Sequence, residues 1–264
     1  KRFVGMSSSV NIIELAKYLG ISKSTVSKAL RDSYEISAET KQRVLAAAKE
    51  LNYQPNPYAS SLRKHRSKTI AVILPQVDNN FLATATKGIQ SIAHERDYHV
   101  LLYLTYDDPA KEIAIFNLLK SGRVDGIIIS TVSQNDKMQH IEEMSAKGLP
   151  IIFIDRVNES FPTTKVVSND VESAFKSVEH LISKGCKRIA YMYVLQNFSI
   201  GKRRLQGYLQ ALEKYNIPVD DDLIIKCNQD YEGNYNLVKN LLSSKNPPDA
   251  ILSPVEKMAI TSYY

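Results

Sequence analysis

Residues 21–30 read Ile-Ser-Lys-Ser-Thr-Val-Ser-Lys-Ala-Leu, and this stretch is predicted to be a short helix with two unlike faces. Ser22 is a suitable N-cap because its hydroxyl can accept from the free backbone N–H groups of the first turn. Val26, Ala29 and Leu30 recur at helical spacing and form one apolar face. The other face carries polar or cationic residues and no acid: Lys23, Ser24, Ser27 and Lys28. Such a helix suits an anionic partner, although an ordinary amphipathic surface helix has the same pattern.

The segment just upstream predicts another helix in a defined relation to the first. Asn11 and Glu14 make a capping-box pattern, so a helix is expected over Ile12–Leu19. Gly20 should end that helix, because glycine tolerates the left-handed backbone turn. A helix, a glycine turn and a serine-capped helix in this order make the helix-turn-helix arrangement.

A third helix should complete the unit. It is expected from the Ser37 cap to about Leu51, and the residues predicted to face the first two helices are Val44, Leu45, Ala48 and Leu51. In a helix-turn-helix, residues near the start of the second helix reach base edges in the major groove of DNA. Here that prediction falls on Lys23, Ser24, Ser27 and Lys28. A small three-helix module that binds protein is the alternative.

The positive charge is concentrated in this part of the chain. Residues 1–67 hold twelve Lys and Arg against five Asp and Glu, whereas the remaining residues hold 22 against 23. A basic surface confined to one quarter of a chain is typical of phosphate binding. A basic membrane-binding segment would need an exposed apolar face, and these helices use theirs to pack against one another. Double-stranded DNA is therefore the expected partner, and no membrane is.

Two longer stretches carry a family resemblance. Residues 10–30 read V-N-I-I-E-L-A-K-Y-L-G-I-S-K-S-T-V-S-K-A-L, and residues 44–56 read V-L-A-A-A-K-E-L-N-Y-Q-P-N. Together they closely resemble the headpiece of the lac/gal/purine repressor (LacI/GalR) family of bacterial transcription regulators. The resemblance continues to the end of the chain, with the motifs in the same order.

A short basic linker follows the headpiece. Asn56 and Pro57 can start a helix there, but its two or three turns are too few for stability on its own. The resemblance implies that paired hinge helices of a dimer enter the minor groove, where Leu62 wedges between base pairs and Arg63 holds phosphate. Ser60 stands where the family usually has arginine. A plain basic linker is the alternative.

From residue 69 onward the periodicity changes. Apolar, strand-like runs alternate with amphipathic helices, which is typical of a parallel, doubly wound α/β sheet. Strands are expected at residues 70–74, 99–104, 126–130 and 151–154, and then at 188–194, 223–226 and 250–253. The resemblance implies that the two sets form a periplasmic-binding-protein-like effector module of two subdomains with a cleft between them.

The expected organisation is sequential along the chain. It comprises a disordered leader at 1–9, the headpiece at 10–56, the hinge at 57–67, an effector N-subdomain at 68–167 and a C-subdomain at 168–264. The sequence stops within the helix that follows the 250–253 strand. Against the family pattern, the second subdomain is therefore expected to be incomplete.

Ligands of such sheets bind beyond the carboxyl ends of the strands. The resemblance places these residues in the effector pocket: Phe81, Leu82, Asp155, Arg204 and Gln229. Phe81 and Leu82 would form a wall, and Asp155 would accept ligand hydroxyls. Arg204 would hold an oxygen-rich group, since a guanidinium suits vicinal hydroxyls, carboxylates and phosphates. A structural salt bridge is the alternative role for Arg204.

The sequence thus predicts a cytoplasmic, dimeric repressor that binds a pseudo-palindromic operator and responds to a small effector, namely a sugar, a sugar derivative or a purine. A small-molecule sensor without operator control is the alternative. No enzyme and no cofactor are expected, because the chain has no phosphate-binding loop, dinucleotide fingerprint or nucleophile elbow. No metal site is expected either, because the two cysteines have no zinc-like spacing and the histidines are scattered along the chain. Cys186 and Cys227 are expected to be reduced thiols.

Overall fold

The computed structural model describes residues 10–53, 66–133, 138–227 and 231–263. The predicted leader at 1–9, all but the last two residues of the predicted hinge, and Gln229 lie outside the described residues. Contacts divide the chain into two compact units, residues 1–65 and 66–264.

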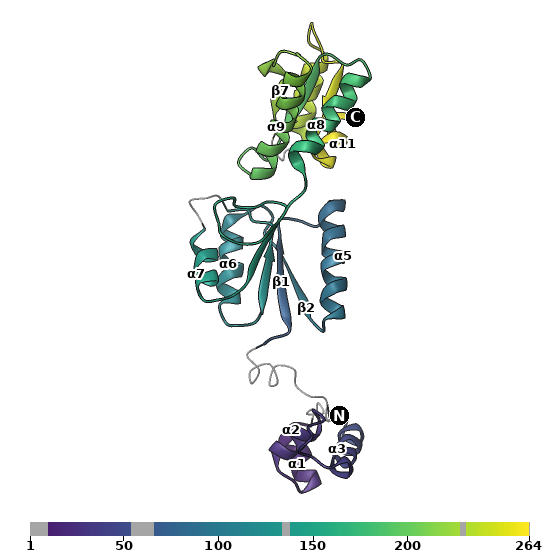
Figure 1. The fold of residues 1–264 in the computed structure, drawn as a ribbon, viewed down its shortest axis with the longest axis vertical. Helices are drawn as coiled ribbons and strands as arrows, with labels where there is room; N and C mark the ends of the chain where they lie inside the picture. The colour runs from purple at the N-terminus through teal and green to yellow at the C-terminus, as the bar shows by residue number, and fades with distance from the viewer. Residues whose placement is uncertain (1–9, 54–65, 134–137, 228–230, 264) are drawn as a thin grey trace, which may run out of the picture. The chain divides into compact units, whose positions relative to one another are not determined.

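The first unit contains the three expected helices, α1 (Ile12–Leu19), α2 (Lys23–Ala29) and α3 (Ala38–Glu50) (Figure 1). The capping box is formed, because the Asn11 amide oxygen accepts from the Glu14 N–H and the Glu14 carboxylate accepts from the Asn11 N–H. Gly20 has φ +67°, the left-handed conformation that ends α1. The predicted order of helix, turn and helix is confirmed.

One predicted core contact of this unit is wrong. Leu45 is 55% exposed, and Ala47 is buried in its place. The buried face of α3 follows Val44, Ala47 and Ala48. This is the i, i+3, i+4 spacing of a single helix stripe, so Leu45 points away from the other helices.

In the second unit, a five-stranded parallel sheet comes first. Its strands are β1 (Thr69–Leu74), β2 (His99–Leu104), β3 (Gly126–Ile129), β4 (Ile151–Ile154) and β5 (Lys165–Val166), in the order β2-β1-β3-β4-β5. The two-residue β5 was not predicted. Its helices are α5 (Asn80–Glu95), α6 (Pro109–Leu119) and α7 (Gln139–Ala146).

These helices cover both faces of the five-stranded sheet, with α5 on one side and α6 and α7 on the other (Figure 1). Alternate β1 residues serve the two cores, because successive side chains of a strand point to opposite faces. Val72 and Leu74 pack with Leu82 of α5. Ala71 and Ile73 pack in the cluster that contains Phe116 of α6.

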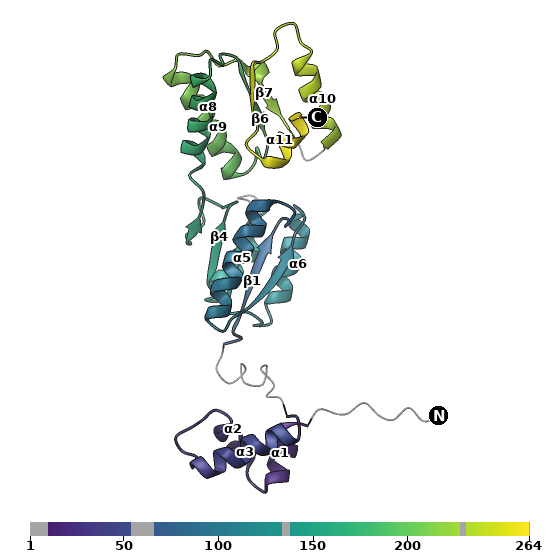
Figure 2. The same ribbon diagram turned by 90° about the vertical axis from the view of Figure 1, so that its right-hand side faces the viewer.

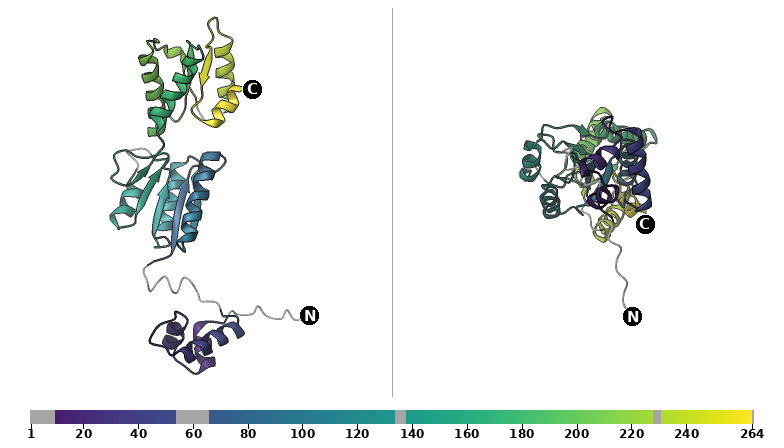
Figure 3. Two further views of the ribbon diagram at one scale, coloured as in Figure 1. Left: turned by 45° about the vertical axis from the view of Figure 1, so that its right-hand side comes forward. Right: turned by 90° about the horizontal axis from the view of Figure 1, so that it is seen from below.

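The second half of this unit is built on a three-stranded parallel sheet with the order β7-β6-β8. Its elements are α8 (Asp170–Ser183), β6 (Ile189–Tyr193), α9 (Ser199–Lys214), a 3-10 turn (Asp221–Leu223), β7 (Ile224–Lys226), α10 (Tyr231–Leu242), β8 (Ala250–Leu252) and α11 (Glu256–Tyr263). Helices α8 and α9 cover one face, and α10 and α11 cover the other (Figures 2 and 3). The predicted α/β class with two parallel sheets is confirmed.

A close contact between α8 and α9 sets the geometry of this half. A Cβ added at Gly207 of α9 would lie 2.1 Å from the Val171 carbonyl oxygen and 2.9 Å from the Ala174 Cβ. The helices can therefore meet only because residue 207 has no side chain. Next to it, the buried Tyr208 hydroxyl donates to the Ile189 carbonyl oxygen at 2.9 Å and ties α9 to β6.

Candidate functional site

The predicted base-facing residues lie on the outer side of α2. Lys23 and Ser24 are exposed, while Ser27 and Lys28 are partly buried. Val26, on the opposite side of the helix, is fully buried. The Ser22 hydroxyl caps α2 by accepting from the Thr25 N–H at 3.0 Å, and this bond stabilises the first turn. Lys23, the cationic residue of that turn, points away from the core.

Lys28 has a partner that the sequence did not reveal. Its ammonium group forms an ion pair with the carboxylate of Glu35, which lies in the turn between α2 and α3. Both side chains remain about half exposed, at 41% and 46%. The pair therefore stands at the surface, beside the other residues predicted to face DNA.

A cavity of about 540 Å³ lies in the second unit, at the carboxyl ends of β1, β4 and β6. It is lined by the predicted effector residues that the structure describes: Phe81, Leu82, Asp155 and Arg204. Phe81 is 54% exposed and offers an apolar ring, whereas Leu82 is only 2% exposed and packs mainly in the core of the first sheet. Leu82 therefore offers little surface to a ligand and mainly holds the cavity wall in place.

Arg204 is held in place by two protein acceptors. Its Nε donates to the Asp170 carboxylate at 2.9 Å, and its Nη1 donates to the Pro254 carbonyl oxygen at 2.6 Å. The salt bridge offered as its alternative role is thus present. A guanidinium has five N–H donors, so donors remain for a ligand in the cavity. Holding the planar group rigid also lowers the entropy lost on binding.

Asp155 follows β4 in a left-handed conformation, with φ +59°. The Ser130 hydroxyl donates to its carboxylate at 3.3 Å. Burial raises the pKa of the Asp155 carboxyl, and the positive charges of Arg156 and Arg204 act against that rise. Because the carboxylate is poorly solvated, a ligand hydroxyl that donates to it would gain a strong acceptor.

This pKa shift makes a prediction about stability. An acid whose pKa is raised by folding destabilises the native state once the pH exceeds its unfolded pKa, and the penalty grows until the pH passes its folded pKa. Asp155→Asn should therefore raise the melting temperature at pH 7, and the gain should vanish as the pH falls into the acid range. Asparagine also tolerates the left-handed conformation. Thermal melts from pH 4 to 8 check this.

The control for this variant is Asp78→Asn, at an exposed acid that lines the same cavity. It should leave the melting temperature unchanged over this pH range. If Asp155→Asn lowers stability at neutral pH, the interpretation of the buried carboxylate is wrong.

Arg156, which follows Asp155, is 6% exposed and forms an ion pair with Asp107. Its guanidinium also lies over the ring of Phe198, 4.9 Å from the centroid. Arg156 therefore has a carboxylate partner other than Asp155. Asp155 itself lines the cavity.

A buried polar cluster at the end of β3 escaped sequence reasoning. The fully buried Glu112 carboxylate accepts from the Val132 N–H at 2.7 Å and from the Thr131 hydroxyl at 3.1 Å, and lies 2.9 Å from the His140 Nε2. These contacts fix the segment that follows β3. The separation of Glu112 and His140 along the chain gave no signal for the pairing.

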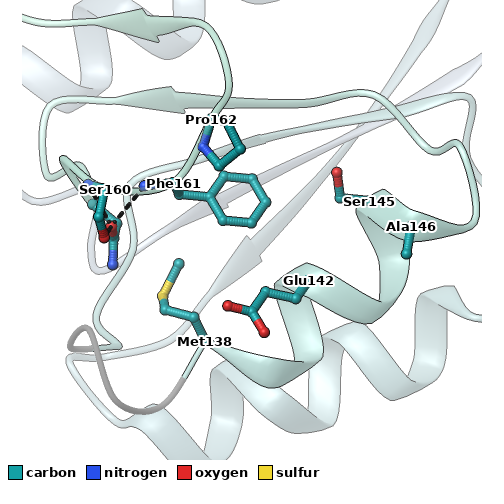
Figure 4. A pocket seen from close by; sticks show the side chains of 8 residues that line it. Met138, Glu142, Ser145, Ala146, Ser160, Phe161 and Pro162 are labelled. Atoms are coloured by element: carbon teal, nitrogen blue, oxygen red, sulfur yellow. Dashed lines mark hydrogen bonds between the residues drawn. The ribbon is translucent and has the colours of Figure 1, made fainter.

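A second cavity, of about 390 Å³, lies beside α7 (Figure 4). Met138, Phe161 and Pro162 give it an apolar wall, and Glu142 brings a carboxylate to its edge. None of the predicted site residues that the structure describes lines it. The cavity at the strand ends is therefore the candidate ligand site. Leu62, Arg63 and Gln229, the remaining predicted site residues, lie outside the described residues.

Comparison with known proteins agrees with this architecture. Residues 11–56 match the bacterial regulatory proteins of the lacI family, and residues 67–264 match the periplasmic binding proteins and sugar binding domain of the LacI family. The transcriptional regulator DegA of Bacillus subtilis is 33% identical over 92% of this chain and 72% of its own length. Catabolite control protein A of Staphylococcus xylosus is 32% identical over 95% and 75%.

Among solved structures, the lac repressor dimer bound to operator and the anti-inducer ONPF superposes with a TM-score of 0.83 at 23% identity, over 97% of this chain and 76% of that one. At this identity the likeness shows the fold. Fold and cavity together define a helix-turn-helix unit joined to a periplasmic-binding-protein-like module. The chain belongs to the lacI family of bacterial regulatory proteins.

In the described part of the chain, no helix is both long and apolar enough to cross a bilayer.

Proposed function

We propose that this chain is a cytoplasmic transcriptional repressor that binds a pseudo-palindromic operator as a dimer and responds to a small molecule in its cavity. The proposal assigns the headpiece to residues 10–56, the hinge to 57–67, and the effector subdomains to 68–167 and 168–264. One observation carries it: α2 buries Val26 and turns the acid-free face with Lys23 and Ser24 outward. Such a face fits the anionic major groove.

A second copy of the chain has a suitable surface in the first sheet. Among the strands that the structure describes, β2 lies at the edge of its sheet and pairs with β1 alone. Leu101 and Leu102 on it are 38% and 39% exposed, and Ile92 of the neighbouring α5 is 58% exposed. An edge strand with exposed apolar residues favours pairing with another chain. The two headpieces of the dimer would then bind two half-sites, whose centres are separated by whole turns of the DNA helix, each roughly 34 Å.

The cavity favours a sugar or sugar derivative as the effector. Asp155 supplies an acceptor and Arg204 supplies donors, which is the pairing that vicinal hydroxyls need, and Phe81 supplies an apolar ring against which a sugar ring can lie. Several of its charged groups are already neutralised by protein partners, among them Arg204 by Asp170 and Arg156 by Asp107. A role in binding, and not in catalysis, is proposed for this set.

Ligand binding and DNA binding would be coupled through the hinge. Binding in the cavity changes the relative stability of the open and closed forms of the effector module. In a dimer, that change alters the distance between the two hinge segments and hence whether they can form helices on DNA. Fluorescence anisotropy on upstream DNA, with and without each of a panel of sugars and purines, tests the proposal. Absence of specific binding to any upstream DNA in these titrations would favour a sensor without operator control.

Leu62→Ala is expected to weaken operator binding while leaving affinity for random DNA nearly unchanged. The reason is that a side chain inserted between base pairs is useful only where the specific complex bends DNA. A gel-shift titration on operator and on scrambled duplex measures both affinities. Equal losses on both would contradict the assigned role.

A further inference from the structure

The ion pair between Lys28 and Glu35 joins α2, the predicted recognition helix, to the turn that follows it. Lys28 is in the last turn of α2, and Glu35 follows seven residues later, before α3 begins. Neither side chain is buried, with exposures of 41% and 46%. Two exposed side chains contribute little to stability when they pair at a surface. The contact therefore has little value as a structural support.

The turn that carries Glu35 is well ordered by its own contacts. The Ser33 N–H donates to the Lys28 carbonyl oxygen at 3.0 Å, and the Ile36 N–H donates to the Ser33 carbonyl oxygen at 3.2 Å. Ile36 packs against the core of the headpiece. Glu35 thus projects from a fixed backbone beside the reading face.

A carboxylate at this position weakens DNA binding unless it contacts a base. A carboxylate near phosphates is repelled, and by neutralising Lys28 it also removes a positive charge from the reading face. A basic headpiece would bind any DNA more strongly without Glu35. The acid should therefore contribute to the choice of sequence and not to the strength of binding.

The remaining hydrogen-bonding capacity of the pair matches one base pair. An ammonium has three donors, and the bond to Glu35 uses one of them. Lysine donors suit guanine O6 and N7, and a carboxylate accepts from cytosine N4. In a G·C pair these groups lie side by side on the major-groove edge.

We infer that Lys28 and Glu35 act as one unit that specifies a G·C pair in each half-site, with Glu35 as a specificity-determining residue outside the recognition helix. This inference rests on the proposed function, because it requires α2 to enter the major groove. It adds Glu35 to the base-facing residues already predicted on α2, among them Lys28.

The test is selection of binding sites from a randomised duplex pool, using the full chain and its variants. Wild type should select a two-fold motif with a G·C pair at one position of each half-site. Glu35→Gln should reduce preference at that position about tenfold and leave the other positions unchanged. Lys28→Gln should lose preference at the same position. The double variant should lose no more than either single one.

Asp32→Asn is the matched control, because it adds the same charge nearby. Asp32 lies in the same turn, pairs with Lys41 at 2.7 Å and has a side chain that is 90% exposed. Both this variant and Glu35→Gln should bind random DNA more tightly, but only Glu35→Gln should change the motif. Identical motifs in the two variants would overturn the inference while leaving the proposed function intact. No motif from wild type would contradict both.

Discussion

Arg204→Met is expected to destabilise the second unit by about 3 kcal/mol and to abolish sugar binding in the cavity. Asp170 is 4% exposed and would lose the Arg204 donor at 2.9 Å. Removing one partner of a buried ion pair costs about 3–5 kcal/mol, and the 23% exposure of the Arg204 side chain places this pair at the lower end. Urea denaturation, followed by thermal-shift titrations with sugars, measures both effects.

The neighbouring arginine provides the control. Arg203 pairs with Glu159 at 2.5 Å, but their side chains are 31% and 51% exposed. Arg203→Met should therefore cost less than about 1 kcal/mol and preserve ligand binding. Equal losses of unfolding free energy in the two variants would mean that the exposure of the ion pairs does not determine their energies. Equal losses of sugar binding would mean that Arg204 is not a ligand-binding residue.

Gly207→Ala should be about as damaging, although it adds a single methyl group. The new Cβ would meet the Val171 carbonyl oxygen at 2.1 Å, and a backbone atom cannot move aside as a side-chain end can. Helices α8 and α9 would have to separate, at a cost of about 3 kcal/mol by comparison with overpacked cores. The free energy of unfolding, taken from denaturant titration, is the direct measurement.

A second glycine shows what the same change does without a clash. Gly88 lies in the interior of α5, and nothing is within 4 Å of a Cβ placed there. Gly88→Ala should stabilise the protein by about 0.5–1 kcal/mol, because alanine loses less backbone entropy in a helix. If both alanine variants were neutral, the close approach of α8 and α9 would have no energetic weight.

Local signals made the headpiece predictable. Asn11, Glu14, Gly20 and Ser22 each mark a helix boundary through bonds to their immediate neighbours, and all four behave as expected. The error at Leu45 has a different origin. A helix with apolar residues in succession has more than one possible buried stripe, and only packing against the other helices selects among them.

The candidate site was predictable at single positions but not as a set of contacts. The family resemblance placed Arg204 near the strand ends, and the arginine does line the cavity there. Its partner Asp170 lies 34 residues earlier, and the two meet because α8 and α9 pack closely. Glu112 and His140, 28 residues apart, are likewise paired by the meeting of α6 with α7. Pairings of this kind arise from tertiary structure and leave no periodic trace in sequence.

The turn between α2 and α3 also bears on how duplicated regulators diverge. Glu35 sits outside the helix whose side chains hold the headpiece core, so its replacement disturbs neither Val26 nor Ala29. If Glu35 selects the base pair as inferred, one change in this turn would redirect a duplicated copy to other promoters while Val26 and Ala29 keep their packing in the headpiece core.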